Sequence, residues 1–373
     1  MRQRLRRCSF LAWILLMSGL VGCHSNSAKQ NARVESIKGN SVEYAKGFAI
    51  FPHPDYTKVV VYNPWEKGKL LASFELVKGH PQKGQLQVPL NKVAIFSATQ
   101  LDAMRKLGLL DNIMGVSDVK YLKNKEILKR YAEHKVVELS QNGDFFIEKI
   151  IEMQPHAIFY SPFNAVQKIP AVLSSIPVIP FLDYMEPSPL GRAEWIKFTA
   201  VFFGREKQAD SIFNDIKTQY LKLKVLAQNV KSRPTVFSGK YYDGQWYVPG
   251  GESYFARIFR DAGGDYLWKD IPKQSSFPLD FEAVFKKAQN ADFWRITGTY
   301  NVTPSYAELA GENQLYTKFS AFNKHHIIYC DPEKTAYFET SPLAPQIVLA
   351  DFIKAFHPEL LPDYHPGYYK ILP

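Results

Sequence analysis

The stretch EKQADSIFNDIKTQYLKLKVLAQN, residues 206–229, decides how the rest of the chain is interpreted. Its apolar residues recur at steps of three and four, which places them along one side of a helix. Gly204 precedes the stretch and Arg233-Pro234 follows it, and both signals favour a helix boundary. A helix of this length spans about 36 Å. It is either an ordinary surface helix or a strut between two parts of the chain, and the flanking segments decide between these alternatives.

Strand and helix signals alternate on both sides of this stretch. Before it, we expect strands at residues 92–96, 113–116, 136–139, 156–160 and 176–181, with helices at 100–107, 145–153 and 189–203. After it, we expect strands at 235–238, 245–248, 291–296 and 327–330, with helices at 250–261, 281–288 and 343–356. Such alternation favours a mainly parallel, doubly wound sheet in each half. The predicted fold class is therefore α/β, with two doubly wound lobes joined by a single long helix.

Residues 42–89 have strand character without a helical period. Apolar runs at 48–51, 58–62, 70–77 and 85–88 are separated by glycine and proline, as in β-hairpins. We expect them to form extra N-terminal β-hairpins.

The chain begins with a leader-like segment. MRQRLRR is followed by a short apolar run and then by Leu20-Val21-Gly22-Cys23, a pattern typical of a secretory signal. The last four residues resemble a bacterial lipobox, which implies cleavage before Cys23 and lipidation of that residue. A plain secreted protein with an incidental cysteine is the alternative. The predicted organisation is listed by residue range: signal peptide 1–22, flexible tether 23–40, N-terminal lobe 41–187, linking helices 188–232 and C-terminal lobe 233–373.

Charge, cysteines and motifs exclude several classes of function. The formal net charge is +10, and without the four arginines of the leader it is 42 − 36 = +6. This remaining charge is spread along the chain without a Lys/Arg block, so we expect no nucleic-acid partner. Of the three cysteines, only Cys330 lies in the predicted folded part, where we expect a buried small hydrophobe and no disulfide. C-x-x-C, H-E-x-x-H, G-x-S-x-G and P-loop patterns are all missing. Catalytic groups can be scattered along a chain, so missing motifs alone do not exclude an enzyme. We predict no enzyme, no metal site and no cofactor.

Several stretches together resemble the substrate-binding proteins of bacterial ABC importers, in the class that carries iron-siderophores, haem and cobalamin. The segment FIEKIIEMQPHAI, residues 146–158, is similar to the N-L-E-x-I-x-x-L-x-P-D-L-V pattern of that family, although His156 replaces the usual Asp. Further similar stretches occur in the family's order at residues 92–108, 204–209, 250–253, 261–264 and 357–360. The resemblance runs from about residue 92 to 372. The extra strands expected at residues 42–89 are more extensive than the corresponding region of many members.

The resemblance implies a periplasmic, lipid-anchored monomer with two α/β lobes, one connecting helix and a ligand in the cleft between the lobes. It also implies docking to the transmembrane subunits of an ABC permease. Glu148 and Glu282 match the family's two lobe-surface glutamates, which pair with arginines of the permease. Each also begins an expected helix, where the helix dipole alone favours an acidic residue.

Ligands of open α/β sheets lie beyond the carboxyl ends of the strands. Aromatic planes offer contact area to a large chelate, and Lys or Arg pairs with carboxylates or catecholates. For Arg295 a structural ion pair is an equal alternative. The residues predicted to bind ligand are Ser97, Thr99, Asn142, Phe163, Tyr184, Lys240, Tyr241, Tyr242, Trp246 and Arg295.

The predicted function is capture of an iron chelate, either a siderophore or haem, for delivery to the permease. Abundant tyrosine together with Lys240 and Arg295 favours iron chelates. The alternatives are a cobalamin-binding protein of the same class and a chelatase-like envelope enzyme that processes a tetrapyrrole. A metal-ion receptor would need a His/carboxylate cluster, which the sequence does not show, and a ligand-free structural lipoprotein would lack an aromatic cleft.

Overall fold

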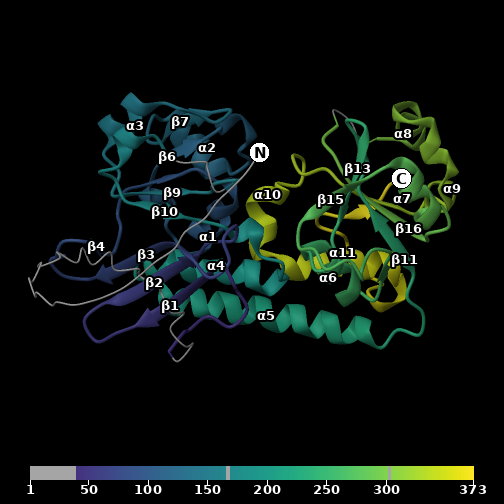
Figure 1. Cartoon of the computed structure of the whole chain (residues 1–373), viewed down its shortest axis with the longest axis horizontal. Coiled ribbons are helices and arrows are strands. Elements are labelled where there is room, and N and C mark those ends of the chain that lie inside the picture. Colours follow the sequence, from purple (N-terminus) through teal and green to yellow (C-terminus); the bar gives the residue numbers. More distant parts are fainter. Residues whose placement is uncertain (1–38, 165–168, 301–303) are drawn as a thin grey trace, which may run out of the picture. The chain divides into compact units, whose positions relative to one another are not determined.

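The computed structural model describes residues 39–164, 169–300 and 304–373. The predicted leader, Cys23 and nearly all of the predicted tether lie outside these ranges. Residues 37–373 form one compact unit. The predicted α/β class is confirmed, because each of two sheets is mainly parallel and is flanked by helices (Figure 1). We call the parts around these two sheets the first and the second lobe.

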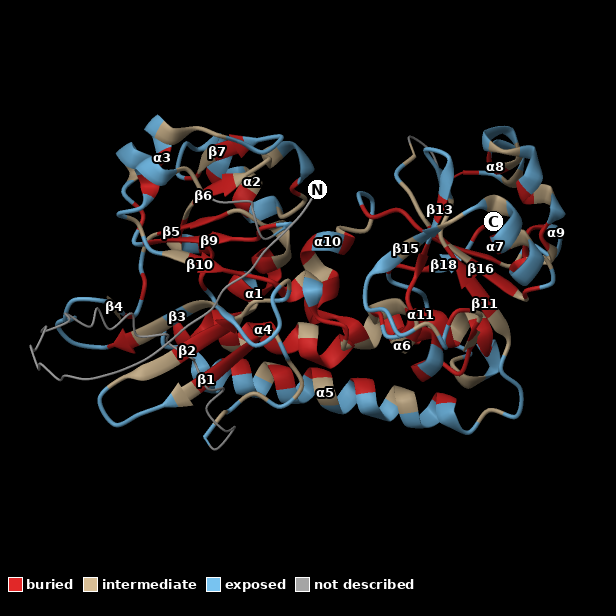
Figure 2. Cartoon of the chain, viewed as in Figure 1, coloured by how far each residue is buried: buried red, intermediate tan, exposed pale blue. Residues whose placement is uncertain are grey.

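The first lobe is built on a six-stranded sheet with the order β10-β9-β5-β6-β7-β8. Its parallel strands are β5 (Val93–Ile95), β6 (Ile113–Ser117), β7 (Val137–Gln141), β9 (Ala157–Tyr160) and β10 (Val178–Pro180), and β8 (Asp144–Phe145) adds an antiparallel edge. Its helices are α1 (Leu101–Lys106), α2 (Lys125–Ala132) and α3 (Ile147–Met153). β5 and β9 are buried along their whole length, as expected for central parallel strands (Figure 2).

A second sheet precedes this lobe in the chain. β1 (Phe48–Pro52), β2 (Thr57–Tyr62) and β3 (Leu70–Val77) form the predicted antiparallel hairpins, but β4 (Gln85–Gln87) pairs with β3 in parallel. The sheet packs on α4 (Pro189–Val201) through Phe48, whose ring centroid lies 4.8 Å from that of Trp195. The buried carboxylate of Glu194 accepts the backbone N–H groups of residues 43–45. These contacts fix the N-terminal sheet to the first lobe.

The second lobe has the sheet order β14-β11-β16-β17-β18. β11 (Thr235–Ser238), β14 (Asp265–Tyr266), β16 (Phe293–Thr297) and β17 (Ile327–Cys330) are parallel, whereas β18 (Lys370–Ile371) is antiparallel. β12 (Tyr241–Tyr242), β13 (Gln245–Pro249) and β15 (Ser276–Leu279) form a separate antiparallel sheet. The helices of the second lobe are α6 (Tyr254–Asp261), α7 (Phe281–Ala288), α8 (Tyr306–Glu312), α9 (Ser320–Asn323), α10 (Tyr337–Thr340) and α11 (Pro345–Phe356).

The predicted long helix is confirmed as α5 (Glu206–Gln228), which runs along both lobes in Figure 1. It packs against α4 on the first lobe and against α6 and α11 on the second. Tyr220 donates a hydrogen bond of 2.9 Å to Asp261 on α6, and the Lys224 ammonium lies 3.2 Å from the same carboxylate. Its other face is exposed (Figure 2). Within the described ranges, no helix is long and apolar enough to cross a membrane.

The lobes also meet through α10, a short helix that follows β17. α10 packs against α1 and the 3₁₀ turn Ala98–Gln100 of the first lobe. The buried Glu339 carboxylate on α10 accepts the backbone N–H of Lys123, and the Lys123 ammonium lies 3.8 Å from Glu333. The covalent link through α5 is therefore supplemented by a polar contact between the lobes.

Candidate functional site: the cleft between the lobes

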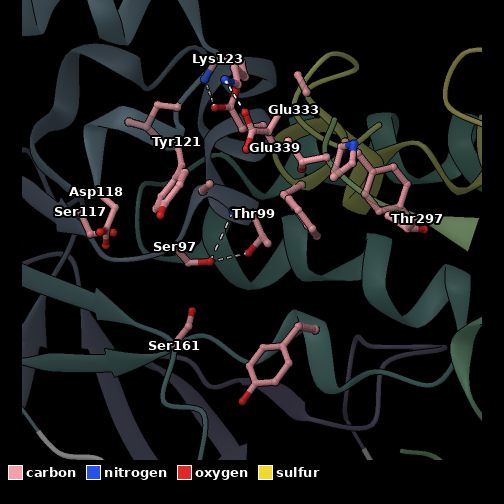
Figure 3. A pocket seen from close by; sticks show the side chains of 18 of the residues that line it. Ser97, Thr99, Ser117, Asp118, Tyr121, Lys123, Ser161, Thr297, Glu333 and Glu339 are labelled. Carbon is pink, nitrogen blue, oxygen red and sulfur yellow. Dashed lines mark hydrogen bonds and ion pairs between the residues drawn. The ribbon is translucent and has the colours of Figure 1, made fainter. Parts of the chain in front are cut away.

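A cavity of about 690 Å³ lies where the two lobes face each other, and we call it the first compartment. The first lobe contributes residues that follow β5, β6 and β9, and the second lobe contributes the end of β16 and residues 332–339 (Figure 3). Parallel strands end at the same edge of a sheet. The polar residues that follow these strands are therefore brought together at the cavity. The volume falls within the range of ordinary small-molecule sites, roughly 300–1,000 Å³.

The loop after β5 is held in place by a chain of hydroxyl and carboxylate groups. The Ser97 hydroxyl accepts the backbone N–H of Thr99 and lies 2.9 Å from the Thr99 hydroxyl. Thr99 in turn donates a 2.8 Å hydrogen bond to Asp183. Ser97 therefore caps this turn. Both hydroxyls line the first compartment.

Asp183 also neutralises one of the two arginines at the cavity. The Arg192 guanidinium lies 2.9 Å from the buried Asp183 carboxylate. Burial, the largest single influence, lowers the pKa of Arg192, but Asp183 together with Tyr254 and Tyr337 outweighs burial and raises the pKa above its ordinary value. Arg192 therefore stays charged, and its charge is already compensated within the protein.

Arg295, in the middle of β16, has no such partner. It donates a 3.3 Å hydrogen bond to the Ser238 hydroxyl and another to the Tyr369 hydroxyl, and its Cζ lies 3.7 Å from the Phe255 ring centroid. Its Nε is buried without a hydrogen-bond partner, and no carboxylate among the described residues lies within 4.0 Å of it. The structural ion pair considered above is therefore not formed. A half-buried cation without a counter-ion makes the cavity favourable for an anionic group.

Aromatic side chains form much of the remaining wall. Tyr121, Phe163 and Phe338 line the first compartment although they are 55%, 74% and 55% exposed. Tyr184 lies deeper, where burial and the nearby Asp183 raise its pKa to about 12, and its hydroxyl donates to the carbonyl of Pro162. Exposed aromatic faces around a cavity are typical of sites that bind large, flat or rounded ligands.

Half of the predicted ligand-binding residues line this compartment, namely Ser97, Thr99, Phe163, Tyr184 and Arg295. Asn142 and Lys240 do not. The Asn142 backbone N–H donates 2.7 Å to Asp118, which does line the compartment, and its side chain accepts from Lys120. Lys240 forms an ion pair with Glu312.

The structure contradicts a ligand contact for Trp246, which is 0% exposed. Its indole packs against Phe237 and Trp294, and its Nε1–H donates a 3.0 Å hydrogen bond to the carbonyl of Ser238. Tyr241 and Tyr242 also lie outside the first compartment, and Tyr242 is 75% exposed on the β12–β13 hairpin. That hairpin has the predicted turn, with φ of 47° at Asp243 and 80° at Gly244.

Several residues at the site were not predicted. Arg192 and Phe255 project from α4 and α6, and Tyr337, Phe338 and Glu339 come from α10. A search along strand ends cannot find residues that reach the cleft from helices. Among the described residues, no group of three or more His, Cys, Asp or Glu side chains is arranged to hold a metal ion.

The two glutamates that match the family's docking positions lie on separate lobes. Glu148 is in the first turn of α3 and Glu282 is in the first turn of α7. Both side chains are exposed, and neither forms an ion pair with the described part of the chain. Their carboxylates are therefore accessible to a partner.

Comparison with known proteins agrees with this geometry. Residues 93–334 match the family described as "Periplasmic binding protein". The chain belongs to the periplasmic binding protein family. Proteins of this family bind substrates and are not enzymes, so this periplasmic binding protein is not an enzyme.

The individual proteins that this chain resembles have low sequence identity to it. This periplasmic binding protein is 28% identical to the "Uncharacterized lipoprotein MJ0878" of Methanocaldococcus jannaschii, over 79% of this chain and 70% of that protein. Its fold matches IsdE of S. aureus, solved in complex with heme, with a TM-score of 0.56 and 17% identity over 71% of this chain and 98% of that one. It also matches an ABC-type Fe3+-hydroxamate transport system protein from Saccharomonospora viridis, with a TM-score of 0.54 and 16% identity over 71% of this chain and 92% of that one.

Proposed function

We propose that this protein captures an iron chelate, a siderophore or haem, in the first compartment and delivers it to an ABC permease. The observation that carries the proposal is the combination of exposed aromatic walls with Arg295, a cation that has no carboxylate partner in the described structure. Iron chelates offer broad apolar or aromatic faces together with peripheral oxygen anions, and this lining is complementary to both. The fold shared with a protein solved in complex with heme and with a protein of an ABC-type Fe3+-hydroxamate transport system supports the same ligand class.

A thermal-shift screen of a soluble form, residues 41–373, tests the ligand class. Haem, ferrichrome, ferric dicitrate and cyanocobalamin are each added in excess. A ligand that binds only the native state at 100 times its Kd stabilises that state by about 2.7 kcal/mol and raises the melting temperature. We expect an iron chelate to give the largest shift. Stabilisation by cyanocobalamin alone would favour the cobalamin alternative, and no shift with any ligand would contradict the proposal.

We further propose that Glu148 and Glu282 dock the loaded protein onto the permease. Their exposure and lack of internal partners support this role, and each sits on a different lobe. An exposed ion pair contributes about 0–1 kcal/mol, whereas pairs that are desolvated at an interface contribute more and fix orientation.

The double variant Glu148→Ala, Glu282→Ala should lose uptake of chelate into permease-containing vesicles but keep the wild-type Kd for the chelate. The matched control is Glu126→Ala, Glu206→Ala, which removes two other exposed glutamates from the first turns of α2 and α5. The control should transport normally. Equal transport by both double variants, or a weaker Kd in the Glu148/Glu282 variant, would contradict the docking role.

The third part of the proposal is a lipid anchor at Cys23, which places the protein in the periplasm at the membrane surface. The lipobox-like Leu20-Val21-Gly22-Cys23 supports it, as does the name of the relative called a lipoprotein. Cells that express Cys23→Ser should release the protein into the soluble fraction and incorporate no labelled palmitate into it. Retention of the variant in the membrane fraction would contradict the anchor.

A further inference from the structure

The cleft continues past the first compartment into a second cavity of about 900 Å³, which we call the second compartment. Tyr184, Arg192, Phe255 and Arg295 line both cavities, so the two compartments meet at these four side chains. Beyond them, the wall is formed by β13, residues 273–278 and Pro64 from the loop between β2 and β3. The N-terminal sheet therefore contributes to the cleft.

Two buried polar atoms at this junction have no hydrogen-bond partner among the described residues. They are Nε of Arg295 and the hydroxyl of Tyr254, and both residues line the second compartment. An arginine N–H can only donate a hydrogen bond, and a tyrosine hydroxyl donates readily. Buried polar groups are nearly always paired in native proteins. Each is therefore a buried donor that lacks an acceptor within the described structure and belongs to a residue that lines the second compartment.

The charges of the second compartment also favour an anion. Lys273 is exposed and forms no ion pair in the part of the chain that the structure describes; its ammonium lies 5.0 Å from the Phe277 ring centroid. Arg295 is a second cation without a carboxylate partner. The acidic residue that lines this compartment, Glu186, is buried and accepts N–H groups from Lys46, Gly47 and Trp195, which hold its carboxylate in place.

We propose that the second compartment binds a carboxylate-bearing arm of the ligand, while the body of the chelate lies in the first compartment. The carboxylate accepts hydrogen bonds from Arg295 at the junction and pairs with Lys273 farther along. This inference rests on the proposed function and narrows it, because it selects chelates that carry free carboxylates over neutral ones. It also gives Lys273 a role in specificity.

Calorimetric titration of residues 41–373 tests the inference with one matched pair of probes and one comparison of two chelate classes. Haem is compared with its dimethyl ester, which lacks only the free carboxylates, and ferric dicitrate is compared with ferrichrome, a neutral hydroxamate chelate. In whichever pair binds, we expect the Kd of the carboxylate-bearing probe to be at least about tenfold lower than that of its neutral counterpart. The reason is that charge-assisted hydrogen bonds are stronger than neutral ones. Equal or tighter binding of the neutral member would overturn the inference and leave the proposed function intact.

Two variants locate the effect. Lys273→Met removes the charge and should raise the Kd of the carboxylate probe roughly fivefold, the effect of one partly screened charge pair, without changing that of the neutral probe. Lys287→Met is the matched control, because Lys287 is also exposed and lies over an aromatic ring, that of Trp268, but does not line the cleft. Equal Kd values for the two variants would overturn the inference. Failure of all four probes to bind would contradict the proposed function itself.

Discussion

Two glutamates that lie close together in the chain, Glu333 and Glu339, contact the first lobe. We predict that replacing them with alanine destabilises this contact by very different amounts. Glu339 is buried, and its carboxylate accepts the backbone N–H of Lys123. Glu333 forms only an ion pair of 3.8 Å with the Lys123 side chain, and both of those side chains are partly exposed. Removing each carboxylate with alanine therefore tests whether burial decides the strength of the contact.

The magnitudes follow from the two environments. A hydrogen bond to a charged group contributes about 1.5–3 kcal/mol when it is buried. We therefore take roughly 1.5–3 kcal/mol for the loss of this bond in Glu339→Ala. For Glu333→Ala the loss is about 0–1 kcal/mol, the usual contribution of an exposed ion pair.

Hydrogen exchange measured by NMR or mass spectrometry reports this contact locally. The amide of Lys123 should exchange roughly 10- to 150-fold faster in Glu339→Ala, because about 1.4 kcal/mol corresponds to a factor of ten. In Glu333→Ala the exchange of this amide should change less than about fivefold. Since both glutamates line the first compartment, the affinity for chelate should also fall more in Glu339→Ala. Unchanged protection in Glu339→Ala, or equal loss in both variants, would refute the reasoning.

Three further predictions concern the core and its titrating groups. Trp246→Ala should lower the free energy of unfolding by about 3–5 kcal/mol in urea titrations, whereas the exposed Tyr242→Ala should change it by less than about 0.5 kcal/mol; equal effects would show that Trp246 is not in the core. Burial raises the pKa of Glu186 above its usual 4.5, against the lowering effect of its hydrogen bonds. The folded protein therefore holds this proton more tightly than the unfolded chain, and the stability of the wild type relative to Glu186→Gln should be greatest below about pH 4.5 and fall as the pH rises through the raised value. A stability difference that grows with pH would be the wrong sign. Burial also raises the pKa of the Cys330 thiol to about 11, so it should react with a thiol reagent at pH 8 only after unfolding; rapid reaction in the native state would contradict its burial.

Local sequence signals predicted the elements whose formation depends mainly on their own residues. The three- and four-residue period of α5 gave its limits to within one residue, and the β12–β13 turn followed from Asp243-Gly244. α2, α8, α9 and α10 were missed. β4 was expected in a hairpin because pairing direction depends on tertiary context, which a short apolar run does not contain.

The difference between local signals and tertiary context also explains which residues of the candidate site were predicted. The strand-end rule selected Ser97, Thr99, Phe163 and Tyr184, which follow strands and line the first compartment. Arg295 also lines it, but β16 continues two residues beyond Arg295. It failed for Trp246, since a strand alternates its faces and the sequence Gln-Trp-Tyr-Val does not say which face is buried. Pairing of β13 with β15, a strand that was not predicted, turns Trp246 inward and leaves Tyr247 to line the second compartment.

The central claim is that the cleft binds an iron chelate through Arg295, and calorimetric titration of Arg295→Met tests it most directly. Methionine keeps much of the packing against Phe255 and removes the charge. Arg260→Met, which removes an exposed arginine from the last turn of α6 outside the cleft, is the control. Loss of one charge-assisted hydrogen-bonded contact of about 1.5–3 kcal/mol should raise the Kd of the chelate roughly 10- to 150-fold in Arg295→Met, while Arg260→Met binds as the wild type does. Wild-type affinity in Arg295→Met, with both variants folded, would contradict the account.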